Sequence, residues 1–324
     1  MARAGIATSQ APVNIAVVKY WGKRDEELIL PLNDSLSLTI NTDDLCATTS
    51  VAALPANVED KLVLNGKALY KLKGNFSFIA RKGSGSACRS MFGGFVRWRA
   101  GVKADGSDSE AIQIAPASHW PEIRIIICVV SDSKKDTGST NGMQRSVATS
   151  DLLKHRVKNI VPQRIEAMQK AILAKDFDTF ARLTMIDSNQ MHAVCQDTYP
   201  PVRYMNQISW DIITLVHRYN EAVGATKLAY TFDAGPNAFL FCLEEDVAEV
   251  LFVLTKLFPS TELDYVRGMY RIPTTKSTPI SEEMIKQIDP YPVGSLKYII
   301  TTKVGDGPRI IEKHLINDQG ETVF

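Results

Sequence analysis

The pattern of apolar and polar positions divides the chain into a first half of predicted strands and a second half of predicted helices. Alternation of apolar and polar residues, with many β-branched side chains, is typical of strands. The strands expected in this way are Ala11–Val18, Ser35–Ile40, Ala47–Leu54, Phe95–Arg99, Ala111–Ala115 and Ile123–Ser131. The last one is continuously apolar, which predicts a strand buried on both faces. The Asn-Gly dipeptide within Lys61–Lys67 favours a type I′ turn and therefore predicts a hairpin.

From Ser146 onward the apolar residues recur at helical spacing. Either Ser150 or Asp151 can cap the first helix, since both side chains accept hydrogen bonds from the unpaired N–H groups of a first turn. The expected elements are helices over 150–172, 177–192, 208–222 and 244–258, followed by a strand over 297–304. This order predicts an α+β fold with two lobes around a cleft. The strand-rich N-terminal lobe would span residues 1–140 and the C-terminal α+β lobe residues 141–324, with the boundary between Ser131 and Ser150.

Composition narrows the class of protein. The chain has 324 residues, and its 37 Lys and Arg against 36 Asp and Glu give a formal net charge of +1. This balance argues against nucleic acid bound through bulk charge, although a local basic pocket stays open. The five cysteines form no CxxC pair, and the histidines are not spaced as metal ligands. No apolar run is long enough for a bilayer, and no signal-peptide cleavage pattern is evident. We therefore expect a cytoplasmic protein of the cytosol with reduced thiols and no membrane partner.

One carboxylate stands between two strongly apolar runs, in the stretch TFDAGPNA from Thr231 to Ala238. Gly235 tolerates positive φ and Pro236 fixes its own φ, so the turn after Asp233 can be tight. An acid held between two buried strands is rigid and partly shielded from water, which suits a group that faces a substrate proton. A plain hairpin turn, with Asp233 bonded to its own backbone, is the alternative that this stretch leaves open.

A second group of candidates is cationic. Lys19, Lys23 and Arg24 surround a Gly and two aromatic residues after a predicted strand, which fits either an anion pocket or a solvated basic turn. The polar stretch Lys134–Met143 is expected to be a loop, in which Ser139 and Thr140 can donate to a phosphate.

A Gly/Ser-rich stretch, GSGS over residues 83–86, is the third candidate. A short helix over 76–80 comes before it, and a second helix over 87–92, with Arg89 inside, is expected after it. N–H groups and hydroxyls at the start of that second helix would then point at one place, which favours an anion site. A flexible linker is the alternative.

Three long strings together resemble the diphosphomevalonate decarboxylase family, within the superfamily of galactokinase, homoserine kinase, mevalonate kinase and phosphomevalonate kinase. They read APVNIAVVKYWGKRDEELILPLNDSLS, RKGSGSACRSMFGGFVRW and AYTFDAGPNA. The resemblance also includes SHWPEIRI, the loop ending GSTNGM and SNQMHAVCQDTYPP, and so covers nearly the whole chain.

This resemblance implies the two-lobed fold of a small-molecule kinase and a soluble homodimer. It also implies conversion of mevalonate 5-diphosphate to isopentenyl diphosphate, ADP, phosphate and CO₂, with ATP and Mg²⁺ as cofactors. The reaction belongs to the mevalonate pathway of isoprenoid, sterol and cholesterol biosynthesis.

The resemblance also assigns roles by position. Asp233 is the catalytic aspartate, which orients or deprotonates the tertiary 3-hydroxyl of the substrate. Arg89 engages the substrate carboxylate, where a bidentate guanidinium fits better than an ammonium. Lys19 and Asn14 complete the catalytic set. The implied substrate-binding residues are Tyr20, Trp21, Gly22, Lys23, Ser84, Gly85, Ser86, Ala87, Cys88, Arg89 and Thr140.

One departure from the family concerns ATP. Family members carry a strand, a Gly-Leu-Ala-Ser-Ser-Ala-type phosphate loop and the helix that it opens, between the Asn65-Gly66 hairpin and the RKGSGSACRS string. No such string occurs in this chain, so we expect an internal deletion near the Lys73-Gly74 junction. An exon-skipped isoform and a gap in the gene model both account for it. The resemblance therefore leaves two outcomes open: an active decarboxylase, or an impaired chain that binds substrate or dimerises without turnover.

Overall fold

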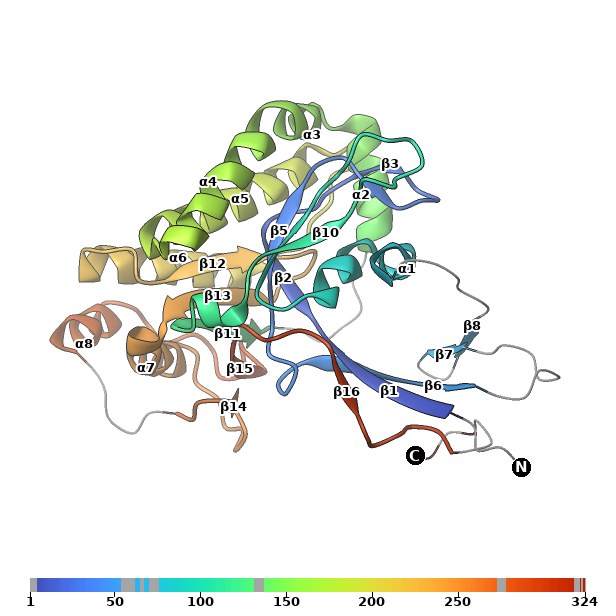
Figure 1. The fold of residues 1–324 in the computed structure, drawn as a ribbon. Coiled ribbons are helices and arrows are strands. Elements are labelled where there is room, and N and C mark those ends of the chain that lie inside the picture. Colours follow the sequence, from blue (N-terminus) through green and yellow to red (C-terminus); the bar gives the residue numbers. More distant parts are fainter. Residues whose placement is uncertain are drawn as a thin grey trace.

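The computed structural model describes residues 5–53, 62–64, 67–69, 76–130, 137–272, 278–317, 321 and 323. Strands form three larger sheets and two hairpins, and most helices gather at one end of the molecule (Figure 1). The helices are α1 (Phe76–Gly83), α2 (Ser139–Thr149), α3 (Asp151–His155), α4 (Val161–Ala174), α5 (Phe177–Asp197), α6 (Gln207–Val223), α7 (Val247–Leu257) and α8 (Pro279–Lys286). The α+β class predicted from the sequence is confirmed.

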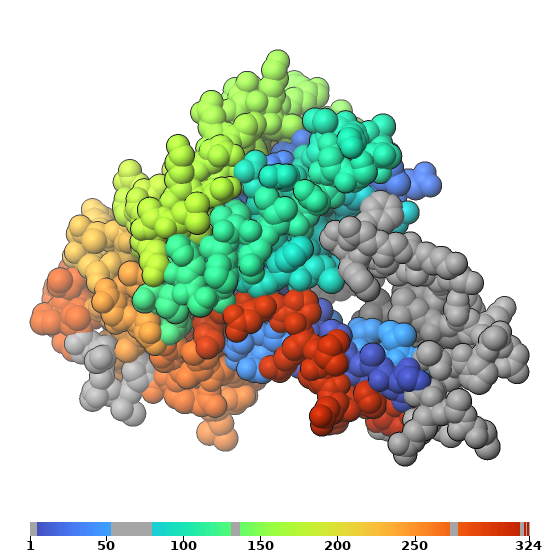
Figure 2. Space-filling view, in the orientation of Figure 1, coloured from blue at the N-terminus to red at the C-terminus, as the bar shows by residue number. Residues whose placement is uncertain are grey.

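The N-terminal strands form two antiparallel sheets. The first sheet has the order β16-β1-β6, and the second has the order β10-β9-β5-β2. Their members are β1 (Gly5–Pro12), β6 (Cys46–Ala53) and β16 (Arg309–Ile311), and β2 (Asn14–Val18), β5 (Ser35–Thr39), β9 (Phe95–Trp98) and β10 (Ala111–Ala115). In Figure 2 the C-terminal segment, in red, lies along the N-terminal strand, in dark blue. The chain therefore returns at its end to the sheet in which it begins.

A five-stranded sheet of order β12-β13-β11-β15-β14 forms the centre of the core. Its members are β11 (Ile123–Val129), β12 (Ala229–Phe232), β13 (Ala238–Leu243), β14 (Val266–Gly268) and β15 (Tyr298–Lys303). Every residue of β11 is buried, which confirms the prediction for the continuously apolar run. β11 comes before the expected lobe boundary, yet it pairs with β13 and β15 of the second half. The boundary itself stays a prediction.

Two hairpins complete the strands: β3 (Lys23–Asp25) with β4 (Leu30–Pro31), and β7 (Leu62–Leu64) with β8 (Lys67–Leu69). The second one confirms the predicted hairpin, while its Asn65-Gly66 turn lies outside the described residues. The expected Lys73-Gly74 junction also lies outside them.

The predicted long helix after Ser150 forms with one irregularity. The Ser150 hydroxyl accepts from the backbone N–H of Leu153, as expected of a cap. Between α3 and α4 the helix widens into a π-helical segment, Arg156–Ile160. Such segments are rare and frequently mark functional sites.

Several sequence predictions were wrong in detail. The strand predicted over 11–18 is two strands that separate at Val13. The second half of the predicted loop Lys134–Met143 is helical, because α2 already begins at Ser139. Met143 there is buried in a cluster with Trp21, so tertiary packing outweighs the turn-forming Ser and Thr of the stretch.

The α-helix predicted over 87–92 is instead a 3₁₀ helix, Gly85–Met91. Ser84 precedes it without a capping bond from its side chain. The Ser86 carbonyl, which an α-helix would use internally, accepts from the side chain of Asn14 at 3.1 Å. A tertiary bond therefore replaces an α-helical one here, and the anion site predicted at the start of this helix stays a prediction. The sequence analysis made no prediction for strands β3, β4, β14 and β16 or for helix α8.

In the described part of the chain, no helix is both long and apolar enough to cross a membrane.

Candidate active site

Most of the predicted site residues converge on one cavity of about 310 Å³. It lies where the end of β2, the 3₁₀ helix, the start of α2 and the turn after β12 meet. The predicted residues that line it are Asn14, Lys19, Tyr20, Trp21, Lys23, Ser84, Gly85, Ser86, Arg89, Thr140 and Asp233. Segments far apart in the sequence thus contribute to a single pocket, whose volume is at the lower end of the range for small-ligand sites.

Lys19 and Asp233 form an ion pair at this cavity, with 2.6 Å between Lys19 Nζ and Asp233 Oδ1. The Lys19 side chain is buried, whereas 54% of the Asp233 side chain is exposed. Burial lowers the pKa of Lys19, and the adjacent Asp233 opposes that shift. A backbone bond from Gly235 N–H to the Asp233 carbonyl, 2.8 Å long, closes the turn. The Asp233 carboxylate is therefore turned toward the cavity and held by a cation.

Arg89 is buried beside the cavity, and among the described residues it donates only to neutral oxygens. Its Nη1 donates to Ser35 Oγ at 2.6 Å, and its Nε donates to Ser37 Oγ at 2.9 Å and to Asn14 Oδ1 at 3.2 Å. Among the described residues no carboxylate lies within ion-pair distance of Arg89. Burial lowers the pKa of this guanidinium. A buried cation without a counter-ion is costly, so the arrangement suits an anionic ligand.

Two aromatic residues form part of the wall. The Tyr20 ring packs on Trp98 with 4.9 Å between ring centroids, and its hydroxyl is buried without a partner among the described residues. Buried polar atoms are rarely left unbonded, so this hydroxyl is suited to donate to a ligand. Trp21 donates from Nε1 to Ser146 Oγ at 3.0 Å, which fixes its ring.

The remaining polar lining includes one buried lysine and the more open start of α2. Lys23 pairs with Glu26 at 2.6 Å, so its charge is partly offset. Thr140 is exposed in the first turn of α2, next to Ser139, which also lines the cavity. Sequence reasoning placed Ser139 and Thr140 in a loop, whereas the first turn of α2 brings both to the cavity. Further lining residues are Ala16, Ile29, Gly83, Met143, Met191 and Ala234.

Three predicted residues do not line the cavity. A Cβ on Gly22 would meet Leu32 Cδ1 at 2.7 Å, and its φ of +94° favours glycine, so it has a backbone role. Ala87 is also absent from the lining. Cys88 is buried against Val96 and Trp98, donates to the Gly85 carbonyl, and has its pKa raised to about 11 by burial. The Cys88 thiol is therefore inert packing.

The structure also shows residues behind the site that sequence reasoning missed. Asp187 on α5 accepts from the backbone N–H of Lys19 at 2.7 Å, and Asn33 donates to the Lys19 carbonyl at 3.1 Å. Ser35 and Ser37 are the hydroxyl partners of Arg89. The alternation in β5 gave no signal for this role, since serine on a strand is commonly a simple surface residue.

ATP and Mg²⁺ are the cofactors that the resemblance implies. No group of three or more His, Cys, Asp or Glu in the described ranges could hold a metal ion. The cavity volume suits one small ligand rather than a nucleotide beside a second substrate. The full sequence, moreover, holds no phosphate loop of the expected type.

Two family models match the chain. The model described as "Mevalonate 5-diphosphate decarboxylase C-terminal domain" matches residues 125–311. The model described as "Diphosphomevalonate decarboxylase-like N-terminal domain" matches in two pieces, residues 11–75 and 67–111. The N-terminal match is thus interrupted around residues 67–75.

Curated relatives and solved structures agree with these matches. The chain is 42% identical to diphosphomevalonate decarboxylase of Homo sapiens and 41% identical to that of Rattus norvegicus, over 97% of this chain and 96% of each relative. The human alignment extends over 389 residues, so with 324 in this chain at least 65 positions lack a counterpart. Mevalonate diphosphate decarboxylase from Trypanosoma brucei superposes with a TM-score of 0.89 at 34% identity, covering 97% of this chain and 100% of that one.

Similarity at this level, across both family models and nearly the full length of the relatives, shows that the chain belongs to the diphosphomevalonate decarboxylase family.

Proposed function

We propose that this chain catalyses the ATP-dependent decarboxylation of mevalonate 5-diphosphate to isopentenyl diphosphate, with release of ADP, phosphate and CO₂. The observation that carries the proposal is the ion pair of Lys19 and Asp233 beside the buried Arg89, in one cavity. Family membership supplies the substrate, and the cavity supplies groups that match its chemistry: cations for a carboxylate and a diphosphate, and a carboxylate for a tertiary hydroxyl.

In the proposed reaction, the cationic residues bind the anionic groups of the substrate, and the carboxylate acts on its hydroxyl. Arg89 binds the substrate carboxylate, while Lys23, Tyr20 and the start of α2 face the diphosphate. Asp233 orients or deprotonates the 3-hydroxyl, because its carboxylate is the acceptor at the cavity. When the 3-oxygen departs as phosphate, positive charge develops on the substrate carbon, and a nearby carboxylate stabilises it.

The apolar lining fits the rest of the substrate. Met143, Met191 and Ala234 line the cavity together with the polar groups. Their side chains are suited to contact the methyl group and the hydrocarbon chain of mevalonate 5-diphosphate, since apolar contacts position the uncharged part of a ligand. The charged wall and the apolar wall of the cavity would together hold the substrate in one orientation.

A second candidate function is binding without turnover. The interrupted N-terminal match and the unmatched positions of the human alignment support an internal deletion near Lys73-Gly74. Phosphoryl transfer depends almost entirely on positioning and electrostatic stabilisation, so loss of a phosphate loop would remove the cradle of the transferred group. A chain of this kind would bind mevalonate 5-diphosphate and release little CO₂.

Two measurements on the purified full chain decide between these candidates. Calorimetry with mevalonate 5-diphosphate measures binding, and release of labelled CO₂ from substrate carboxyl-labelled with ¹⁴C, with ATP and Mg²⁺ present, measures turnover. Turnover that Asp233→Asn abolishes supports the decarboxylase, and binding without CO₂ supports the second candidate. Absence of both heat and CO₂ would contradict both.

We also propose a homodimer in the cytosol, acting in the mevalonate pathway toward sterols such as cholesterol. Family resemblance and the mostly buried free thiols (Cys88, Cys128, Cys195 and Cys242) support this location. Light scattering after gel filtration tests the dimer: a mass near 72 kDa, twice the 35.9 kDa of one chain, is expected, and a mass of one chain would overturn it.

A further inference from the structure

The backbone of Lys19 is held by side chains rather than by a sheet. Lys19 directly follows β2, and the pairing of β2 with β5 ends at Val18. Its peptide groups therefore need other partners, because buried N–H and C=O groups are almost always bonded. The Lys19 N–H donates to Asp187 Oδ2 at 2.7 Å, and the Lys19 carbonyl accepts from Asn33 at 3.1 Å and from Arg156 Nη2 at 3.4 Å.

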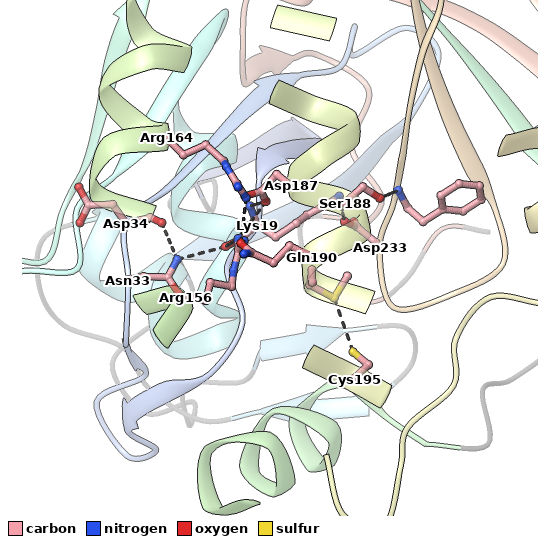
Figure 3. Close-up of polar contacts among 12 residues, drawn as sticks. Lys19, Asn33, Asp34, Arg156, Arg164, Asp187, Ser188, Gln190, Cys195 and Asp233 are labelled. Atoms are coloured by element: carbon pink, nitrogen blue, oxygen red, sulfur yellow. Dashed lines mark hydrogen bonds and ion pairs between the residues drawn. The ribbon is translucent and has the colours of Figure 1, made fainter. Parts of the chain in front are cut away.

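Asp187 and Arg156 are fully buried and bonded to each other, with 2.9 Å between Arg156 Nη2 and Asp187 Oδ2. A second guanidinium, that of Arg164, lies 2.8 Å from Asp187 Oδ1. Gln190 accepts from both arginines, at 2.6 and 2.9 Å. Figure 3 shows these side chains gathered around the backbone of Lys19. Every strong acceptor in this cluster is therefore bonded.

Two of the three side chains that bond the Lys19 backbone come from different helical segments. Asp187 lies on α5, and Arg156 is the first residue of the π-helical segment between α3 and α4. Arg164 lies on α4 and, in the described part of the chain, bonds Asp187 and Gln190 rather than Lys19. The pair Arg156 and Arg164 is therefore a natural comparison between a group that touches Lys19 and one that only supports Asp187.

We infer that Asp187 and Arg156 are positioning residues, which clamp the two peptide groups of Lys19 and thereby aim its ammonium at Asp233 in the cavity. The ammonium lies 2.6 Å from the carboxylate, a distance that a small rotation of the Lys19 backbone would lengthen. Residues of this kind keep a catalytic group in position because their own side chains are fixed by packing and hydrogen bonds. The effect on substrate rests on the proposed function, whereas the effect on Lys19 does not.

The competing explanation is that the cluster only joins α4 to α5. Under that explanation, removal of either arginine would lower stability and leave the cavity unchanged. Arg156→Met and Arg164→Met separate the two, since each removes one guanidinium from Asp187 and one donor to Gln190. Asp187→Asn is the third variant, because it keeps the side-chain shape and removes the charge.

The first readout is the Lys19 side chain itself, observed by NMR of protein labelled with ¹³Cε-lysine at pH 7. Loss of one signal in Lys19→Met assigns the resonance. We expect the Lys19 signal to shift in Arg156→Met and Asp187→Asn and to stay in place in Arg164→Met. An unmoved Lys19 signal in all three variants would overturn the inference, whatever the thermal stability. Should Arg156→Met fail to fold, Arg156→Lys takes its place, since a single nitrogen lacks the fork by which Arg156 bonds Gln190 from one nitrogen and Asp187 and Lys19 from the other.

The second readout is calorimetry with mevalonate 5-diphosphate. We expect Arg156→Met and Asp187→Asn to weaken binding about tenfold or more, and Arg164→Met to stay within about twofold. Equal weakening by both arginine variants would show a structural role and overturn the inference. If the unaltered chain gave no heat, the proposed function would fail, and the NMR result would still decide whether the clamp exists.

Discussion

Lys19 and Arg89, two of the buried cations that line the cavity, differ in the partners that hold them. Lys19 faces the carboxylate of Asp233, and a second carboxylate, Asp187, lies behind its backbone. Arg89 is held by two serine hydroxyls and the amide of Asn14. Burial lowers the pKa of both groups. Of the two, only Lys19 has a described carboxylate within ion-pair distance.

This difference assigns different tasks to two similar charges. The positive charge of Lys19 is offset, so it serves to hold Asp233 in place. The positive charge of Arg89 has no carboxylate beside it in the described part of the chain, while neutral oxygens fix its geometry. A charge that is oriented and left uncompensated is suited to bind an anion from solution, and a guanidinium matches a carboxylate with two parallel bonds.

The largest effect is expected from the removal of the counter-charge at Lys19. Asp233→Asn should lower the turnover number by roughly 10²–10⁴, as expected for loss of a general base, with substrate affinity little changed. CO₂ release at saturating substrate measures turnover, and calorimetry measures affinity. The turnover of the unaltered chain is the reference. If that rate is too low to measure, both variants are compared in a chain that carries the phosphate-loop segment of the family.

Nearly unchanged turnover in Asp233→Asn would remove this residue from the chemistry. A matched control is Asp34→Asn, because Asp34 forms an ion pair with Arg97 and does not line the cavity. That variant should keep the turnover of the unaltered chain.

An intermediate effect is expected when protonation of His192 places a further positive charge near Lys19. His192 on α5 is buried, and burial, followed by the charge of Lys19, lowers its pKa from 6.5 to about 4. The unfolded chain therefore binds more protons than the folded one between about pH 4 and 6.5, so the free energy of unfolding falls as pH drops through this window. The loss is on the order of 3 kcal/mol.

Urea unfolding at pH 7.5 and pH 4.5 measures this loss. His192→Gln should lose less stability over that interval than the unaltered chain, and His155→Gln, at an exposed position, should behave as the unaltered chain does. Equal acid sensitivity in His192→Gln would show that His192 is not the group responsible.

The smallest effect is expected from one of the hydroxyls that hold Arg89. Ser35→Ala removes the acceptor of Arg89 Nη1, and hydrogen bonds to charged groups contribute about 1.5–3 kcal/mol. Substrate affinity should therefore fall about tenfold, as measured by calorimetry. Thr39→Val, on the same strand, removes a hydroxyl that bonds the Phe92 carbonyl, and it should leave affinity unchanged. Equal losses in both variants would point to a general effect on the sheet.

Much of the fold was predictable because its signals are local. The apolar run of β11 and the helical spacing over α4–α6 depend on neighbours in the sequence, and the structure confirms them. The turn at Asp233 was predictable for the same reason. Family resemblance, rather than periodicity, named most of the residues that line the cavity.

The rest depends on contacts between distant segments. The 3₁₀ form of Gly85–Met91 follows from bonds to Asn14, Ser35 and Ser37, which no local pattern encodes. The sequence analysis made no prediction for Asp187 and Arg156, yet both are fully buried and bonded to the backbone of Lys19. Pairing of β16 with β1 joins opposite ends of the chain and had no signal in the sequence.

The central claim is that the guanidinium of Arg89 binds the carboxylate of the substrate. Calorimetry with two ligands tests it directly: mevalonate 5-diphosphate, which has this carboxylate, and isopentenyl diphosphate, which has lost it. Arg89→Met should weaken binding of mevalonate 5-diphosphate by about 50-fold or more, because a charge-assisted bidentate pair is lost. It should change binding of isopentenyl diphosphate by less than about threefold. Equal weakening for both ligands, or none for either, would contradict the account.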